Sequence, residues 1–152
     1  MPNVVIADTS CFIILSNIGE LDILQILYKQ ITTTPDIAAE FGEPLPDWII
    51  IKAPSDHQKQ LILEQQVDKG EASAIALALE IPESLIILDD LEGRNLANHL
   101  GITMTGTIGV LVKAKLKGII PSIKPLLTKI KLTNFRISPL IEASALKEAG
   151  EL

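Results

Sequence analysis

The sequence predicts one α/β domain over residues 1–152, a three-layer α/β/α sandwich around a central, mostly parallel sheet. Two short aliphatic runs, residues 4–7 and 85–88, contain no polar side chain, which is typical of strands buried on both faces of a parallel sheet. Segments with helical spacing separate the strand-like runs, and this βαβα alternation indicates a sheet covered by helices on both sides. A length of 152 residues is enough for such a domain to bury a core.

The first half of the chain alternates apolar runs with turn residues. Gly19 separates two helical segments, and Pro35 follows a β-branched run at the position where a helix commonly starts. The predicted elements are a strand at 4–7, helices at 11–15 and 21–28, a strand at 31–34, a short helix at 36–41 that stops at Gly42, a short edge strand at 48–51, and an amphipathic helix at 55–67.

The second half contains the strongest helix pattern, an Ala- and Leu-rich segment at 71–79 that follows a predicted break at Lys69 and Gly70. The further predicted elements are a strand at 85–88, a helix through Arg94 to Leu100, a strand at 102–105, a turn at 106–109 leading into a helix at 110–117, a helix from Pro121 to about Lys131, and a terminal helix at 139–149.

Composition excludes several classes of protein. Cys11 is the only cysteine, so no internal disulfide can form, and one Cys with two His disfavours a structural zinc site. No apolar stretch reaches the ~20 residues that span a bilayer, and the N-terminus lacks the basic region and cleavage site of a signal peptide. We therefore expect a cytoplasmic protein with no membrane association.

The charge is unevenly distributed along the chain. Residues 1–90 carry 4 Lys or Arg and 15 Asp or Glu, a balance of −11, whereas residues 91–152 carry 9 and 4, a balance of +5. Such asymmetry can indicate a nucleic-acid surface. Two ordinary solvated faces explain it equally well.

Carboxylates occur where this fold would bring them together. Asp8 directly follows the first strand, and Asp89 and Asp90 follow the strand at 85–88; the carboxyl ends of parallel strands are where such sheets bind ligands. Glu40 and Glu71 lie on helices that could pack against the same edge. Clustered carboxylates repel one another unless a hard cation lies among them, and oxygen ligands suit Mg²⁺ or Mn²⁺, which can activate a water and stabilise a leaving oxygen.

Each acid also has a purely structural interpretation. Asp8 could cap the following helix, and Glu71 could simply place a favourable charge at a helix N-terminus, worth ~0.3–1 kcal/mol. The turn containing Thr107 could form an anion-binding nest. No Ser/His/Asp or Cys/His set for nucleophilic catalysis is apparent in the sequence.

The ordered set of motifs resembles the PIN domain: DTS at 8–10, Glu40, GEASAIALAL at 70–79, and LIILDD at 85–90 before a helix. LDDLEGRNLA at 88–97, followed by HLGITMTGTIGVLVKAKLKGIIPSIKPLL at 99–127, is similar to the DUF3368 branch, which is related to VapC-type toxins. The resemblance covers nearly the whole chain. It implies a Mg²⁺- or Mn²⁺-dependent endoribonuclease, the toxin of a type II toxin–antitoxin pair.

The resemblance also implies roles for individual residues. Asp8 matches the first metal-binding acid, with Ser10 as the hydroxyl of the D-x-S pattern; Glu40 matches the second acid; and Asp90 matches the acid of the T-x-D pattern. Glu71 stands where an Asp is usual, and Leu88 replaces the hydroxyl of T-x-D. The residues expected to act in catalysis are Asp8, Glu40, Glu71 and Asp90; those expected to hold metal are Asp8, Glu71, Asp89 and Asp90; and Ser10 and Thr107 support them.

The expected partners are RNA, a small antitoxin and a second copy of the chain. Arg94, Lys113, Lys115 and Lys117 are candidates to bind the RNA backbone, although solvated surface lysines are the simpler interpretation of the last three.

Two alternatives remain. A PIN-fold module that binds RNA or a protein without catalytic turnover would share every one of these motifs. A phosphoacceptor receiver domain also gathers Asp residues at strand ends, but it needs paired acids after the first strand and a Lys after the last one, whereas here the pair follows a later strand and residues 104–106 contain no Lys.

Overall fold

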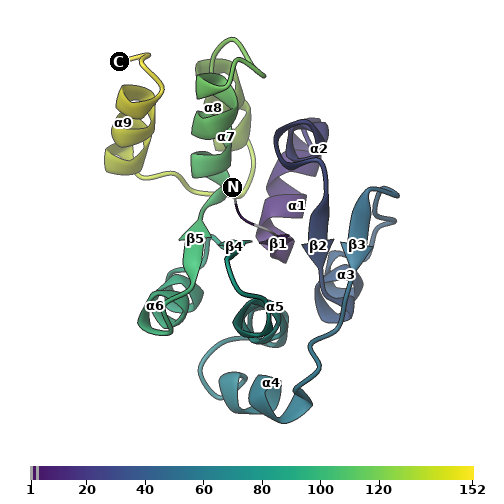
Figure 1. Cartoon of the computed structure of the whole chain (residues 1–152). Coiled ribbons are helices and arrows are strands. Elements are labelled where there is room, and N and C mark those ends of the chain that lie inside the picture. The colour runs from purple at the N-terminus through teal and green to yellow at the C-terminus, as the bar shows by residue number, and fades with distance from the viewer. Residues whose placement is uncertain (1, 3) are drawn as a thin grey trace.

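A five-stranded sheet, all of whose strands are parallel, organises the computed structural model, which describes residue 2 and residues 4–152 (Figure 1). The strands lie in the order β3-β2-β1-β4-β5, and their bounds are β1 (Val4–Ala7), β2 (Ile31–Thr33), β3 (Ile49–Ile51), β4 (Ser84–Ile87) and β5 (Thr103–Thr105). The predicted α/β/α sandwich with a parallel sheet is therefore confirmed.

The two central strands form the best-paired part of the sheet. Residues of β1 and β4 are in register from Val4 opposite Ser84 to Ala7 opposite Ile87. Ile6 and Ile86 are completely buried, as expected for continuous aliphatic runs covered on both faces. The predicted edge position of β3 is also correct, and Ile50 and Ile51 are exposed there.

Helices cover both faces of the sheet. The described residues form α1 (Thr9–Asn17), α2 (Asp22–Tyr28), α3 (Pro35–Phe41), α4 (His57–Leu63), α5 (Lys69–Glu80), α6 (Leu91–His99), α7 (Thr107–Leu116), α8 (Lys124–Lys131) and α9 (Pro139–Glu148). Figure 1 shows α4, α5 and α6 on one side of the sheet and α1, α2, α7 and α8 on the other. Helix α5 packs directly on β1 and β4, α3 contacts both α1 and α5, and α9 packs on α7.

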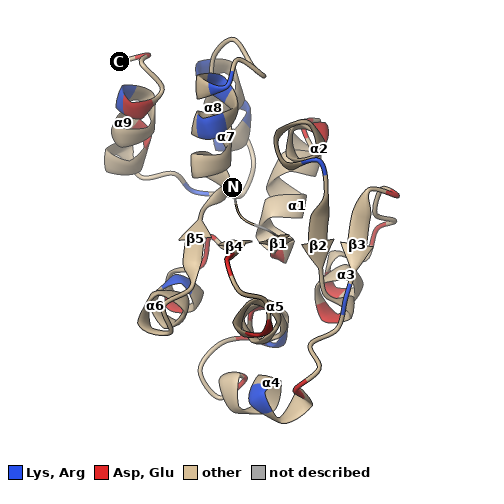
Figure 2. Cartoon of the chain, in the orientation of Figure 1, with Lys and Arg blue, Asp and Glu red and all other residues tan. Residues whose placement is uncertain are grey.

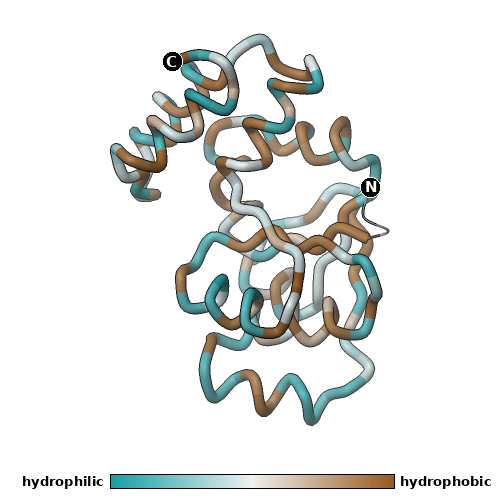
Figure 3. The backbone as a smooth tube through the Cα atoms, turned by 60° about the vertical axis from the view of Figure 1, so that its left-hand side comes forward, coloured by the Kyte–Doolittle hydropathy of each residue, from teal (hydrophilic) through white to brown (hydrophobic). Residues whose placement is uncertain are grey.

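The hydrophobic core follows the same arrangement. It runs through the central strands, α1, α5 and the middle of α7, with Phe12, Ile75 and Leu111 among its largest fully buried side chains. Figure 3 shows hydrophobic residues concentrated in the middle of the molecule and hydrophilic residues on the outer helices. Within the described residues no single helix is long and apolar enough to cross a membrane; α1 and α2 satisfy that test only as a pair that is bent by 117° at its break.

Four predicted boundaries were wrong. The amphipathic helix predicted at 55–67 is limited to α4. Asp56 is its N-cap, because the Asp56 side chain accepts a hydrogen bond from the backbone N–H of Lys59. Lys69 and Gly70 are not a break but the first turn of α5. The turn predicted at 106–109 is already helical from Thr107, and the helix predicted from Pro121 begins only at Lys124.

The strand order creates one special position in the sheet. From β1 the chain adds β2 and β3 on one side, and it then returns to add β4 and β5 on the other side. The crevice at the carboxyl ends of β1 and β4 is therefore a topological switch point, where open parallel sheets bind ligands.

Candidate active site

Asp8 and Asp89 lie next to each other at the switch point because hydrogen bonds join the ends of β1 and β4. The backbone N–H of Asp8 donates to the carbonyl of Ile87 at 3.1 Å. Ser10 Oγ, in the first turn of α1, donates to Asp89 Oδ2 at 3.1 Å. The two strand-end acids that the sequence singled out are thus brought together.

Asp89 is held on both of its oxygens. Thr107 donates its backbone N–H to Asp89 Oδ1 at 2.8 Å and its hydroxyl to Asp89 Oδ2 at 2.6 Å, in addition to the bond from Ser10. This carboxylate therefore joins the starts of α1 and α7 to the end of β4. Ser10 and Thr107, predicted as supporting residues, both contact the same acid.

Asp90 has a different environment from its neighbour. It is the N-cap of α6, and its Oδ2 accepts from the backbone N–H of Gly93 at 3.2 Å. One oxygen is thereby engaged in capping, and the other keeps its capacity to accept. The two adjacent aspartates thus differ, since Asp89 accepts three hydrogen bonds on its two oxygens and Asp90 accepts one.

Glu71 enters the site from the first turn of α5. Its side chain is only 7% exposed, and its Oε2 has no hydrogen-bond partner. Gly93 on α6 makes room for it, because a Cβ at that position would lie 2.5 Å from Glu71 Oε2. A side chain at position 93 would therefore force the Glu71 carboxylate to move from its observed position.

Glu40 reaches the site from α3, which ends one residue later and is capped by Gly42 in the left-handed conformation. The hydroxyl of Thr9 donates to Glu40 Oε1. A Cβ at position 70 would lie 2.8 Å from the same oxygen. A side chain at position 70 would therefore displace the Glu40 carboxylate, and the glycine leaves room for it beside the first turn of α5.

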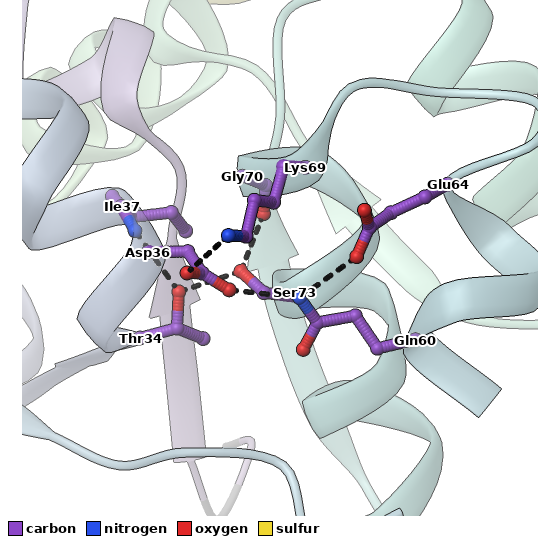
Figure 4. A network of polar contacts seen from close by, with 8 residues as sticks. All are labelled: Thr34, Asp36, Ile37, Gln60, Glu64, Lys69, Gly70 and Ser73. Carbon is purple, nitrogen blue, oxygen red and sulfur yellow. Dashed lines mark hydrogen bonds and ion pairs between the residues drawn. The ribbon is translucent and has the colours of Figure 1, made fainter. Parts of the chain in front are cut away.

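A polar network joins α3 to α5, the helices that carry these two glutamates (Figure 4). The hydroxyls of Thr34 and Ser73 lie 2.6 Å apart, and Ser73 Oγ also donates to the carbonyl of Gly70 at 2.7 Å. Nearby, Asp36 accepts from Gln60 Nε2 at 2.8 Å and pairs with Lys69 at 3.7 Å. Since Thr34 and Ser73 are fully buried, this network fixes the helices that carry Glu40 and Glu71.

These residues surround one open pocket of about 530 Å³ at the switch point. Its wall includes the hydroxyl-bearing turn of α1 together with Leu91 and Phe135. Its acidic members are Asp8, Glu40, Asp68, Glu71, Asp89 and Asp90. All five acids predicted from the sequence therefore line a single pocket, joined by a sixth.

Burial and mutual repulsion raise the pKa values of two of these acids. Desolvation raises the pKa of Asp8 to about 7; Asp68, Glu40 and Asp89 add to the rise, and the backbone N–H of Thr9 partly opposes it. Desolvation likewise raises the pKa of Glu71 to about 9, with Asp68, Asp90 and Asp8 contributing. At neutral pH the pocket without a cation therefore retains protons on its deepest carboxyls.

The donor set fits a hard divalent cation. Asp8 Oδ1 and Glu71 Oε2 are buried without any hydrogen-bond partner, and oxygen-only donors are what Mg²⁺ and Mn²⁺ prefer. Across the described residues, no three Asp, Glu, His or Cys side chains are arranged to hold one ion as they stand. An ion held by one or two of these carboxylates would take its remaining ligands from water, as Mg²⁺ often does in proteins.

The basic candidates separate into two groups. Arg94 lies close to the acids, where its Nη1 donates to the carbonyl of Leu88 at 2.8 Å. Lys113 and Lys115 are on the part of α7 that lies beyond the pocket, and Lys117 directly follows that helix. Lys113 lies over the ring of Tyr28, and Lys115 pairs with Glu151 at 3.3 Å. Lys115 is eight residues after Thr107, about 12 Å along the helix. Figure 2 shows this separation of basic α7 and α8 from the acidic strand ends.

Sequence reasoning missed Asp68. It is the N-cap of α5, and its Oδ1 accepts from the backbone N–H of Glu71 at 2.8 Å. Its charge raises the pKa of both Asp8 and Glu71. The signal was present in the sequence, because Asp68 and Glu71 have the spacing of a capping box, but the adjacent Gly70 made the segment resemble a break.

Comparison with known families adds an independent line of evidence. The family model DUF3368, described as a PIN domain, matches residues 4–151. Among curated proteins, none matches the chain. The match spans every strand and every helix described above.

Proposed function

Because the chain belongs to the DUF3368 family of PIN domains, and PIN domains are generally nucleases, we propose that it is a Mg²⁺- or Mn²⁺-dependent endoribonuclease. The observation that carries this proposal is the pair of buried carboxylate oxygens, Asp8 Oδ1 and Glu71 Oε2, in a pocket lined by six acids. Leaving two buried carboxylate oxygens unsatisfied is costly. A divalent cation would remove that cost.

Asp8 and Glu71 would hold the ion, and Asp90 would contribute the oxygen that does not cap α6. Asp89 would keep the surrounding turns in place. A bound divalent ion supplies charge neutralisation at a phosphodiester and lowers the pKa of a bound water. Glu40 keeps one oxygen free beside the pocket and is the candidate to accept a proton from the attacking water. The guanidinium of Arg94, which donates to the carbonyl of Leu88 next to Asp89, is a candidate to contact the RNA backbone.

The test is cleavage of RNA by the purified protein with and without Mn²⁺. We expect metal-dependent cleavage that Asp8→Asn abolishes. Asp47→Asn is the matched control, since Asp47 is an exposed loop residue that undergoes the same chemical change far from the pocket. Equal cleavage by wild type and Asp8→Asn would assign the activity to a contaminant and overturn the proposal.

A catalytically weak relative that only binds RNA or protein is the second candidate. Two observations favour it: no three donors are gathered for one ion within the described residues, and Leu88 occupies the place of the usual hydroxyl. RNA binding without any Mn²⁺-dependent cleavage would select this candidate over the first.

We further propose that the chain is the toxin of a toxin–antitoxin pair and is held inactive by a small partner. A partner that places an Arg among Asp8, Glu71 and Asp90 would neutralise the pocket in place of the metal, because a guanidinium binds carboxylates in a bidentate manner. Such competition is reciprocal. Mn²⁺ should therefore weaken the affinity of the partner, as should Asp90→Ala; if neither does so, the partner inhibits from another surface.

A further inference from the structure

Beside the acid pocket lies a second, mostly apolar groove, and we propose that it binds a nucleotide adjacent to the scissile phosphate. In this proposal the base stacks on Phe135, and the phosphate contacts Arg94 and Arg136. The inference rests on the proposed function and adds to it a substrate-positioning surface. It concerns single-stranded RNA, because only an unpaired base can enter such a groove.

The groove has the size and lining of a small-ligand site. It encloses about 670 Å³ between β5, α7, α9 and the segment 135–137, within the range typical of such sites. Its floor includes Met104, Ile108 and Val112, and Ile137 and Ala145 contribute to the opposite wall. Apolar walls of this kind favour a flat, poorly hydrated group such as a nucleobase.

The groove is continuous with the acid pocket. Asp89, Leu91 and Phe135 line both cavities. A polymer whose phosphate lies at the acids therefore places its neighbouring nucleotide past Phe135 and into the groove. This continuity ties the apolar surface to the proposed substrate.

Phe135 differs from the other aromatic residues in its surroundings. Phe12 is completely buried and packs against Phe41 at 5.8 Å between ring centroids, and the ring of Tyr28 lies beneath Lys113. Phe135 is only partly buried and lines the acid pocket, the groove and a third cavity on its far side. It is thus the aromatic ring available for stacking at the site.

The groove carries two guanidinium groups beside two carboxylates, Asp89 and Glu148, and the guanidinium groups are the ones that would contact RNA phosphate. Arg94 and Arg136 both line it, and neither forms an ion pair in the part of the chain that the structure describes. Arg94 uses one N–H for the carbonyl of Leu88 and keeps the others. Guanidinium groups bind phosphate through two parallel hydrogen bonds and also stack on bases. Glu148 lines the groove as well, at α9.

The wall formed by α9 is fixed rather than hinged. Glu151, just after α9, accepts from Lys115 Nζ at 3.3 Å, from the backbone N–H of Ile123 at 2.8 Å and from Ser122 Oγ. These bonds tie the end of α9 to α7 and to the start of α8. These bonds restrain the end of the α9 wall, and a wall restrained before substrate binds lowers the entropic cost of binding.

Binding of a fluorescein-labelled ten-nucleotide single-stranded RNA, followed by anisotropy with Ca²⁺ in place of Mn²⁺, tests the proposal. Phe135→Ala should weaken binding about fivefold or more. Phe135→Leu keeps the apolar packing but lacks a ring, so it should weaken binding too. Arg136→Gln should reduce the salt slope by ~0.7. Lys129→Gln, which removes an exposed charge on α8, is the matched control and should change nothing.

RNAs with a single abasic nucleotide locate the stacked base. One abasic position should weaken binding to wild type, and the same abasic position should have little effect on Phe135→Ala, because the stacking partner is already missing. Thermal melting of Phe135→Leu confirms that the fold is retained. If no abasic position behaves in this way, the stacking proposal is overturned.

Mn²⁺-dependent cleavage by wild type separates this proposal from the proposed function. Cleavage with unchanged binding in the Phe135 and Arg136 variants would overturn the groove and leave the nuclease standing. Variant-sensitive RNA binding without cleavage would overturn the nuclease and leave the groove standing. Variants that weaken a protein partner but not RNA would assign the groove to that partner and overturn the proposal.

Discussion

The raised pKa values of Asp8 and Glu71 predict that the metal-free protein loses stability as the pH rises from 5 to 8. Asp8 titrates at about 7 in the folded protein rather than at 3.8, and Glu71 at about 9 rather than at 4.5. Between the ordinary and the raised pKa the folded state holds a proton that the unfolded state has released. The unfolded state is therefore favoured by each increase in pH.

The magnitude follows from proton linkage. One extra proton in the folded state lowers the free energy of unfolding by about 1.4 kcal/mol per pH unit. Both groups contribute between about pH 5 and 7, so the slope there is at most about 3 kcal/mol per unit, and only Glu71 contributes from about pH 7 to 9. Glu151, whose pKa is lowered to about 2 chiefly by Ser122, stabilises the fold above pH 4.5 and loses that effect only at lower pH.

Urea unfolding in EDTA at pH 5, 6, 7 and 8, followed by the fluorescence of the single Trp48, measures this slope. Glu71→Gln cannot titrate, so it should remove about 1.4 kcal/mol per unit from the slope. Glu43→Gln, at an exposed loop position, is the control and should follow wild type. Saturating Mn²⁺ should oppose the trend, since metal ligands must be deprotonated.

Two results would refute this reasoning. One is a wild-type stability that stays level or rises between pH 5 and 8 without metal. The other is an identical slope in wild type and Glu71→Gln, which would mean that Glu71 ionises in the folded protein as it does in the unfolded chain.

Three further predictions concern the metal, the site geometry and the RNA surface. Mn²⁺ at 100-fold its Kd should raise Tm by about 5 to 10 °C, and a similar rise in Asp8→Asn would place the ion elsewhere. Gly93→Ala should displace Glu71 and reduce cleavage even though alanine favours a helix; wild-type cleavage by this variant would show that the space is not needed. Lys113→Ser with Lys117→Ser should lower the salt slope of RNA binding by ~0.7 per contact, whereas an unchanged slope would assign both lysines to solvent.

The fold and the three pocket aspartates that follow strands could be predicted from the sequence because both depend on strand ends, whereas Glu40 and Glu71 were predicted as helix residues that could pack against the same edge. Residues 4–7 and 85–88 are aliphatic throughout, which is typical of central strands of a covered sheet. A carboxylate that directly follows such a strand is necessarily at the carboxyl edge. The positions of Asp8 and Asp89 were therefore determined by local pattern and topology alone.

Two glycines were misinterpreted as a helix break or a turn because the contacts that favour glycine there are with residues of other elements. Gly70 suggested a break before α5, but it stands inside the helix because a side chain there would meet Glu40. Gly109 suggested a turn before α7, although a Cβ at that position would lie 2.4 Å from Thr105 Oγ1. Nothing in a single sequence distinguishes a glycine that ends a helix from one that lets a helix approach its neighbour.

The lysines of α7 were predicted from local spacing, but the tertiary structure gives one of them another role. Their spacing on one helix predicted a shared surface for RNA, but Lys115 donates to Glu151 and to the carbonyl of Ala149 across the fold. Phe135 and Arg136, in contrast, belong to an irregular segment with no motif, and their position beside the acids depends on how α9 returns to α7. Long-range packing, which local pattern does not encode, decided both cases.

The six pocket acids are distinguished by how far hydrogen bonds to the protein already occupy them. Asp68 and Asp90 each cap a helix, Glu40 accepts from the hydroxyl of Thr9, and Asp89 accepts from Ser10 and Thr107. Asp8 occupies the N-cap position of α1 yet makes no capping bond through its side chain, so the capping interpretation fails for the residue to which it applied most naturally. Asp8 and Glu71 are the two that keep a buried oxygen with no partner and raised pKa values. Burying these two oxygens without partners destabilises the fold and makes no structural contact, so we expect their function to be the binding of a cation.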